Sequence, residues 1–129
     1  MRALVRLALI QDPTLITLGV VPEGVFAGDV DTPDQRPFLQ LRWSNTTPGV
    51  DVVSRRDLVI WVHDNAGDYE RIDSVIRRIK TIMSQLVGVP HAAGYLMVCE
   101  WTGDSADLTD DGHGTITRTT SFSIVGTGQ

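Results

Sequence analysis

Side chains that could perform catalysis are few in this sequence, which contains three histidines and one cysteine. His63 precedes Asp64 at the end of an apolar segment, where an aspartate commonly acts as a turn or cap residue. His91 follows Pro90 and has no obvious partner in the sequence. We therefore interpret His63-Asp64 as structural, and we assign no chemistry to His91.

The remaining histidine and the cysteine also favour structural roles. His113 lies in Asp110-Asp111-Gly112-His113-Gly114, whose spacing matches neither a calcium-binding loop nor a zinc-binding helix motif. Because aspartate and glycine populate tight turns, we interpret this segment as a hairpin turn. Cys99 lies between Val98 and Glu100 with no neighbouring basic residue to activate a thiolate, so we expect a buried, inert thiol.

Motifs for catalysis and nucleotide binding are missing from the sequence. Gly103-Asp104-Ser105 lacks the Gly-x-Ser-x-Gly spacing of a nucleophile elbow. Neither a phosphate-cradling Gly-Lys-Ser/Thr nor a dinucleotide fingerprint occurs. The basic cluster Arg77, Arg78 and Lys80 is typical of the solvated face of a helix that also carries acids. We predict no catalytic, cofactor-binding or metal-binding residue, and we expect that the chain is not an enzyme.

The composition is that of an ordinary folded domain. Of the 129 residues, 42% are hydrophobic and 21% are charged, which is enough to bury a core within one domain. The formal net charge of −5 argues against tight binding to nucleic acid, which needs clustered Lys and Arg. The single cysteine excludes an intrachain disulfide and a cysteine-based zinc site.

The N-terminal segment resembles a signal peptide only superficially. Arg6 interrupts its apolar run, which ends at Asp12-Pro13 without a small-residue cleavage site. No segment approaches the length of a membrane span. We expect a soluble protein made in a reducing cytoplasm.

Two short helices are expected at the start of the chain. Residues 2–11 form the first. The second covers residues 13–18, because Asp12 can cap its free backbone N–H groups and Pro13 lacks the N–H that would be unsatisfied there. Gly19 ends this helix, since glycine tolerates the left-handed conformation.

A Pro- and Gly-rich loop over residues 20–37, with a short extended piece at Val25-Phe26, leads into the strands. The second strand, Asp57–His63, is apolar on both faces, which is typical of a central strand covered on both sides. The last two strands predict a hairpin joined by the loop Thr102–Gly114. The strands are expected at Phe38–Ser44, Asp57–His63, Tyr95–Trp101 and Thr115–Val125.

A long amphipathic helix lies between the second and third strands. Its apolar residues recur at three- and four-residue spacing, which predicts one buried stripe. Asp68 can cap its start, Gly88 and Pro90 end it, and Asp73 and Arg77 form a favourable pair one turn apart. The stripe comprises Ile72, Val75, Ile76, Ile79, Ile82, Met83 and Leu86.

The resulting order α-α-β-β-α-β-β predicts a single α+β domain over residues 1–129. Its sheet is expected to be four-stranded and mixed or antiparallel, with the long helix packed on one face and the short helices at the N-terminus.

The layout resembles the tail-terminator or tail-completion proteins of long-tailed, siphovirus-type bacteriophages, especially those infecting actinobacteria. The resemblance covers nearly the whole chain, and its motifs are patterns of elements and turns rather than catalytic signatures. It rests on the restart at Asp12-Pro13, Gly19-Val20, the extended Val25-Phe26, Asp34-Gln35-Arg36-Pro37-Phe38, the strand Leu58 to Asp64 feeding Gly67-Asp68-Tyr69, Glu100-Trp101-Thr102-Gly103-Asp104-Ser105, the Asp-rich turn and the Thr-rich last strand near Phe122.

The resemblance implies a structural virion protein at the head-proximal end of the tail, assembled in the host cytoplasm. Such proteins form a ring, commonly a hexamer, on the tail tube protein once the tube has reached its length. The ring ends polymerisation and offers a surface to the head-tail connector or stopper protein. DNA passes through its hole without specific binding, and the resemblance implies neither a cofactor nor a membrane.

Two sets of residues are candidates for contacts in such a ring. A channel rich in aspartate would not hold phosphate. We therefore expect some of Asp104, Asp107, Asp110 and Asp111 to face the lumen or a partner ring. A ring also needs heterologous contacts, for which the 20–37 loop, the 45–56 connection and the second strand are candidates. Trp43 and Trp61 are either anchors of that interface or part of the domain core.

Other functions remain open at this point. Another neck protein, such as a head-to-tail stopper, would share the size and oligomeric habit. A non-viral small-ligand-binding or regulatory domain and a hydrolase that uses His63 or His113 are the alternatives from other classes.

Overall fold

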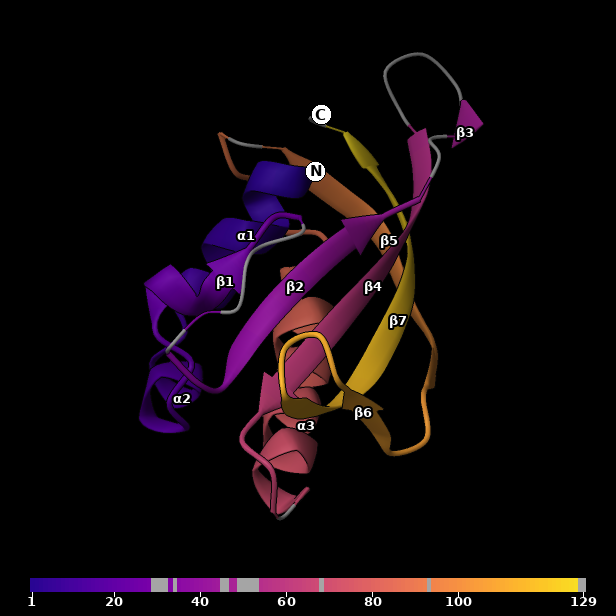
Figure 1. The fold of residues 1–129 in the computed structure, drawn as a ribbon. Coiled ribbons are helices and arrows are strands. Elements are labelled where there is room, and N and C mark those ends of the chain that lie inside the picture. Colours follow the sequence, from indigo (N-terminus) through magenta and orange to yellow (C-terminus); the bar gives the residue numbers. More distant parts are fainter. Residues whose placement is uncertain are drawn as a thin grey trace.

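A curved sheet carries the fold, with helices packed beside it (Figure 1). The computed structural model describes residues 1–28, 33, 35–44, 47–48, 54–67, 69–92 and 94–127. Helix α3 lies along one face of the sheet, and α1 and α2 lie near the edge that ends in β1 (Figure 1). The elements are α1 (Arg2–Ile10), α2 (Pro13–Thr17), the 3₁₀ turn η1 (Pro22–Gly24), β1 (Val25–Phe26), β2 (Phe38–Trp43), β3 (Thr47–Pro48), β4 (Ser54–Asp64), α3 (Glu70–Leu86), β5 (Tyr95–Asp104), β6 (Leu108–Asp110) and β7 (Thr115–Thr127).

The sheet is mixed, and β4 lies at its centre. Over the described residues seven strands join it in the order β1-β2-β4-β7-β5, with β3 paired to β4 and β6 to β7. β1 and β2 are parallel, whereas β4 runs antiparallel to both β2 and β7. The α+β class, the four long strands and the helix on one face confirm the prediction. The extended piece expected at Val25-Phe26 is confirmed and pairs with β2 as β1. The strand count of four was wrong, because this piece was not counted as a strand and β3 and β6 are too short to show alternation in a sequence.

The last two long strands pair as expected, but much of the predicted loop between them is strand. β5 continues to Asp104, and β6 folds back onto β7 so that Thr109 pairs with Ile116. Only residues 105–107 and the turn 111–114 remain outside strands. The aspartate-glycine turn is confirmed, and Asp110 Oδ1 accepts a hydrogen bond from the backbone N–H of His113 at 3.1 Å.

The N-terminal helices begin and end for the reasons found in the sequence. Asp12 Oδ2 accepts a hydrogen bond from the backbone N–H of Leu15 at 2.9 Å, which confirms the cap. Gly19 has a φ of 102°, a conformation that disfavours any side chain, and it follows the end of α2.

The apolar stripe of α3 forms the core together with the inner face of the sheet. This face includes Leu58 and Ile60 of β4 and Phe122 of β7, all of which belong to one buried cluster with α3. Such burial contributes on the order of 10 kcal/mol before the entropy cost. The buried residues of α3 are Ile72, Val75, Ile76, Ile79, Ile82 and Met83.

The charged residues of α3 are less solvated than expected. Arg78 and Lys80 form salt bridges with carboxylates from other elements, and only Arg77 of the basic cluster is fully exposed. Asp73 binds Arg118 of β7 instead of Arg77. The solvated basic face and the Asp73–Arg77 pair were predicted wrongly, because the actual partners of these charged side chains are distant in the sequence. Among the described residues, α3 forms the salt bridges Arg71–Asp64, Asp73–Arg118, Arg78–Asp12 and Lys80–Asp104.

β4 is covered completely on one face only. Leu58, Ile60 and Val62 are fully buried beneath α3, whereas Val59 and Trp61 on the opposite face are half-buried. The expectation of full cover on both faces was therefore wrong for these two residues, because α3 lies on one side of the sheet (Figure 1).

Some predicted features lie outside the described residues. These are the Asp68 cap, Asp34 in the approach to β2, and residues 45–46 and 49–53 of the connection before β4. Within the part of the chain that the structure describes, no helix is long and apolar enough to cross a membrane.

Replacing Ile79 with aspartate should unfold the domain. Ile79 is fully buried at the centre of the α3 stripe, and an unpaired carboxylate there should cost about 4 kcal/mol or more. Thermal unfolding followed by circular dichroism should lose its cooperative transition. Ser84→Asp, at an exposed position of the same helix, is the matched control and should retain it. A folded Ile79→Asp variant would contradict the packing of α3 on the sheet.

Candidate functional site

Two of the four aspartates expected at a lumen or partner ring are engaged within the chain. Asp104 Oδ2 accepts a hydrogen bond from Lys80 Nζ at 2.7 Å. Burial alone would raise the pKa of Asp104, but hydrogen bonds from Lys80 and Trp101 outweigh it and lower that pKa. Asp110 is held against the turn by the backbone N–H of His113. Both carboxylates therefore have structural partners.

The other two aspartates are exposed on a segment that is fixed in place. The side chain of Asp107 is 63% exposed, and Asp111 is exposed in the turn after β6. Arg118 holds this segment, because its Nε and Nη2 atoms each donate to the carbonyl oxygen of Ser105 at 3.1 Å. The Nε atom of Arg118 also lies 3.7 Å from Asp107 Oδ1. Carboxylates are thus presented to the outside from an anchored segment.

His63 lies in a buried polar cluster on the face of the sheet opposite α3. Its Nε2 atom is 2.8 Å from Gln40 Oε1, and its Nδ1 atom is 2.9 Å from Thr115 Oγ1. Because the amide oxygen of Gln40 can only accept, Nε2 carries the proton and Nδ1 accepts from the threonine hydroxyl. Phe38 stacks on the imidazole with ring centroids 4.5 Å apart. Both ring nitrogens are therefore occupied.

The electrostatics of this cluster keep His63 neutral. Burial lowers its pKa to about 4, and the nearby charges of His113 and Arg36 act in the same direction, whereas Asp110 opposes them. The ring of His113 packs edge-on against that of His63, with centroids 5.1 Å apart. The two histidines that the sequence kept separate thus meet, but His63 has no free nitrogen to act as a base.

The cysteine and the acidic side chains offer little further chemistry. Cys99 is half-buried rather than fully buried, and burial raises the pKa of its thiol to about 11. An unactivated thiol was expected, and this environment agrees with it. Among the described residues, no three His, Cys, Asp or Glu side chains are grouped so that they could hold a metal ion.

The two tryptophans proposed as ring anchors lie on opposite faces of the sheet. Trp43 pairs with Leu58 in the register and packs against the edge of the core. Trp61 pairs with Gln40 and lies on the other face, beside His63. Both are half-buried, so each contributes to the domain and still presents part of its ring to the surface.

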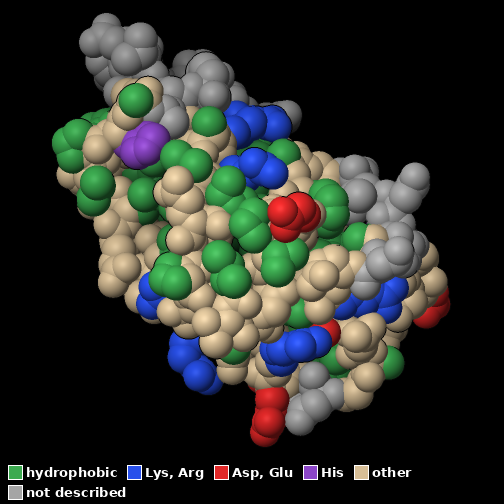
Figure 2. Space-filling view, turned by 90° about the vertical axis from the view of Figure 1, so that its left-hand side faces the viewer, with side chains coloured by type: hydrophobic (Ala, Val, Ile, Leu, Met, Phe, Trp, Pro, Cys, Tyr) green, Lys and Arg blue, Asp and Glu red, His purple; other side chains and the backbone are tan. Residues whose placement is uncertain are grey.

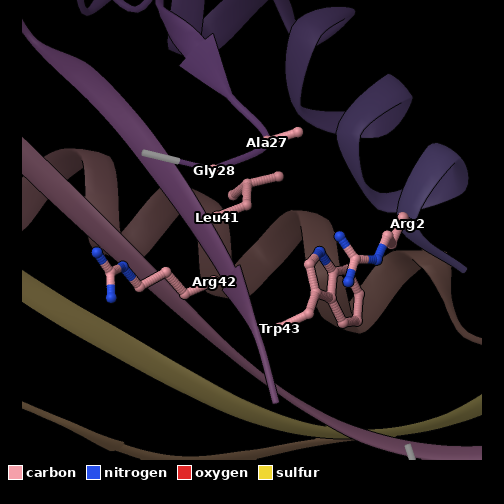
Figure 3. Close-up of a pocket in the computed structure, with 6 residues that line it drawn as sticks. All are labelled: Arg2, Ala27, Gly28, Leu41, Arg42 and Trp43. Carbon is pink, nitrogen blue, oxygen red and sulfur yellow. The ribbon is translucent and has the colours of Figure 1, made fainter. Parts of the chain in front are cut away.

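A pocket of about 280 Å³ opens beside Trp43 at the end of β2. In Figure 3, Arg2 reaches from α1 toward the indole of Trp43, whereas Arg42 points away from it. On the core side, Arg56 Cζ lies 5.2 Å from the centroid of the Trp43 ring. Burial lowers the pKa of Arg56, and the charge of Arg2 lowers it further. The guanidinium groups of Arg2 and Arg56 thus both lie near the ring of Trp43.

The surface also exposes hydrophobic side chains. Trp101 of β5 is 51% exposed, and Tyr95, Met97 and Val98 of the same strand are exposed as well. Lys80 Nζ lies 4.2 Å from the Trp101 ring centroid. On the side of α1 and α2, hydrophobic side chains gather in the middle of the surface among Lys and Arg, and few acidic side chains are visible (Figure 2).

Arg2, Arg56 and Trp101 were not predicted as candidate residues from the sequence. A signal for Arg56 was present, because strand alternation places it on the same face as Leu58. The predicted strand began one residue later, at Asp57, so this inward position was not considered. No local pattern in the sequence predicts that Arg2 lies near Arg56, because this proximity depends on where α1 packs in the fold.

Comparisons with known proteins identify the fold but no family. No family model matches the chain, and no curated protein does. One similar solved structure is titled "Virion of native gene transfer agent (GTA) particle". A chain of it superposes with a TM-score of 0.75 at 16% sequence identity, covering 99% of this chain and 95% of that chain. At this identity the likeness shows a shared fold, which extends over nearly the whole of both chains.

The buried neutral His63 should make the domain sensitive to acid. The folded chain binds a proton at His63 only near pH 4, whereas the unfolded chain does so near pH 6.5. Its contribution to stability is therefore complete above pH 6.5 and is lost as the pH falls toward 4, by about 3 kcal/mol.

The measurement is the free energy of unfolding by urea between pH 7.5 and 4. His63→Gln should flatten the profile between pH 6.5 and 4 relative to the unmodified chain. His91→Gln, at an exposed position, should leave the slope unchanged. Equal slopes for the His63→Gln variant and the unmodified chain would show that His63 is not buried in neutral form.

Proposed function

We propose that the chain is a structural virion protein that caps a phage tail tube as a ring. In this role it ends tail polymerisation and provides the surface to which the head joins. The observation that carries the proposal is the fold shared along nearly the whole chain with a chain of a gene transfer agent virion. The resemblance in the order of elements and turns narrows this to the tail terminator, with a head-to-tail stopper as the alternative.

We propose a structural role rather than an enzyme. Both nitrogens of His63 are engaged, and burial raises the pKa of the Cys99 thiol. The net charge of −5 suits a ring through which DNA slides without being held. Asp107 and Asp111 are the acidic candidates for the lumen or an assembly partner, because both are exposed.

Interfaces between copies would use residues that are only partly covered in the single chain. Trp61 lies half-buried on the face opposite α3, and Trp43 borders the pocket beside α1. β5 ends the strand order of the sheet, and an edge strand with exposed apolar side chains is suited to contact another chain. We propose that these surfaces meet the neighbouring subunit, the tube protein or the connector.

The solution mass of the purified chain over a concentration series tests the ring directly. A closed ring should appear as a species of six times the 14.1 kDa chain mass, with a central hole in negative-stain images. Adding the chain to tube protein should stop tube growth, and labelled chain should lie at one tube end. Binding to portal complexes instead of tubes would identify a stopper.

A matched pair of variants separates the interface from general stability. Trp61→Ala should weaken the ring and leave the fold intact, whereas Ser84→Ala, exposed on α3, should change neither. If the unmodified chain stays monomeric both alone and with tail tubes, the ring and the terminator role are wrong.

A further inference from the structure

Arg56 is a buried cation without a carboxylate partner among the described residues. It is 8% exposed and lies on the inner face of β4, opposite Ile124 of β7. Its Nη2 atom donates to the carbonyl oxygen of Ser44 at 3.5 Å, a long hydrogen bond, and its Nε atom has no partner within that part of the chain. A charge removed from water is costly unless it is paired.

Other cations of the molecule differ from Arg56 in having a carboxylate partner. The cations on or against α3, namely Arg71, Arg78, Lys80 and Arg118, each contact a carboxylate within 4 Å. Arg56 instead faces the indole of Trp43 and feels the charge of Arg2. The fold therefore places the charges of Arg2 and Arg56 near each other, and Arg56 has no carboxylate partner among the described residues.

The pocket next to these groups can admit a side chain. It has a volume of about 280 Å³, and a Cβ atom added at Gly28 in its wall would meet no atom within 4 Å. Arg2 and Trp43 form its other side (Figure 3). A carboxylate entering here would approach the guanidinium of Arg2 and the face of Trp43 that covers Arg56. An arginine offers the bidentate geometry that a carboxylate needs.

A carboxylate fits this place better than a nucleic-acid phosphate. Arg56 is almost completely buried, so a single side chain can reach toward it more easily than a continuous backbone can. The net charge of −5 also repels a polyanion at long range. The anion expected here is therefore an aspartate or glutamate of a protein.

The exposed side chains of Asp107 and Asp111 lie at the other end of the sheet. Trp43 pairs with Leu58, whereas β6 pairs with the start of β7, which faces the end of β4 at Asp64. Six residues of strand separate Leu58 from Asp64, a distance of about 20 Å. One molecule therefore cannot join its acidic segment to its own basic pocket. Two different patches at opposite ends are what a head-to-tail contact requires.

We infer that the pocket lined by Arg2 and Trp43, with Arg56 packed on the Trp43 ring, receives Asp107 or Asp111 from a second copy of this chain. This inference rests on the proposed ring and names the contact that closes it. It also accounts for Arg56, since a carboxylate held by Arg2 would bring negative charge close to a buried cation that has no carboxylate partner among the described residues. Assembly should then weaken as the salt concentration rises.

Arg56→Met tests the inference because two properties should change in opposite directions. Removing an unpaired buried charge should leave the melting temperature of the dilute monomer unchanged or raise it. The same variant should weaken self-association by about tenfold or more in sedimentation velocity. Arg55→Met removes an equal charge from the exposed neighbouring position and should change association by less than about twofold.

Mixing two defective variants tests the head-to-tail geometry. Asp107→Asn/Asp111→Asn should lose rings as Arg56→Met does. An equimolar mixture should give dimers of twice the chain mass and no rings, because one intact pocket and one intact acidic segment remain per pair. Complete rings in the mixture would contradict the contact.

Other outcomes separate this inference from the proposed function. Rings that form equally well with Arg56→Met would overturn the contact and leave the ring intact. A lower melting temperature of monomeric Arg56→Met would mean that Arg56 has a partner within its own chain.

If inorganic phosphate or a short DNA duplex raises the melting temperature of the unmodified chain but not of Arg56→Met, the pocket holds phosphate and the carboxylate assignment is wrong. A chain that never self-associates, even on tail tubes, would overturn both proposals.

Discussion

Helix α3 is positioned by two kinds of contact, and the rest of the structure depends on it. Its apolar stripe packs against the inner face of the sheet, which supplies most of the buried surface. Hydrophobic burial has little directional preference, so it does not fix the rotation and register of the helix by itself. Salt bridges between described residues add that direction, since they join α3 to the cap of α2, the end of β4, the end of β5 and the start of β7.

These salt bridges also position the two surfaces that are proposed to meet in the assembly. Arg118 binds Asp73 of α3 and, with its other donors, the carbonyl oxygen of Ser105. The exposed acidic segment is therefore connected to the core through one side chain. At the opposite end of the sheet, α1 packs on α3 and brings Arg2 beside Trp43. One helix thus fixes the location of both charged ends.

How much the sequence could predict depends on the range of the interactions. The long strands, the α3 stripe, the Asp12 cap and the turn before His113 arise from neighbours in the chain, and all were predicted correctly. The extended piece at Val25-Phe26 was also predicted, but its pairing as β1 was not, and β3 and β6 are stabilised by their pairing partners, so their two or three residues carry no pattern of their own. The meeting of His63 with His113 depends on β6 folding back over β7, which no local signal indicates.

The same distinction separates the candidate sites. The exposed aspartates were recognisable from composition, because a glycine- and aspartate-rich turn lies at a surface almost regardless of the fold. Arg56 was not recognisable, because an arginine in a strand is ordinary until the opposite strand and the docked helix show that no carboxylate among the described residues accompanies it. Arg56 becomes a candidate only once the fold shows which described side chains surround its charge.

A chain with excess negative charge has a particular difficulty in forming a ring, because identical copies repel one another. Hydrophobic contact alone would not choose between orientations of the neighbour. In the proposed ring, the pocket beside Arg2 at one end of the sheet and the exposed Asp107 and Asp111 at the other would turn this repulsion into a preference for one arrangement, since head-to-tail contact brings these unlike charges together. Arg56, which has no carboxylate partner among the described residues, would then contribute to the specificity of the proposed assembly. The free-energy cost of burying Arg56 lowers the stability of the isolated subunit in this proposal, whereas the favourable interaction with a carboxylate forms only when the neighbouring subunit is present.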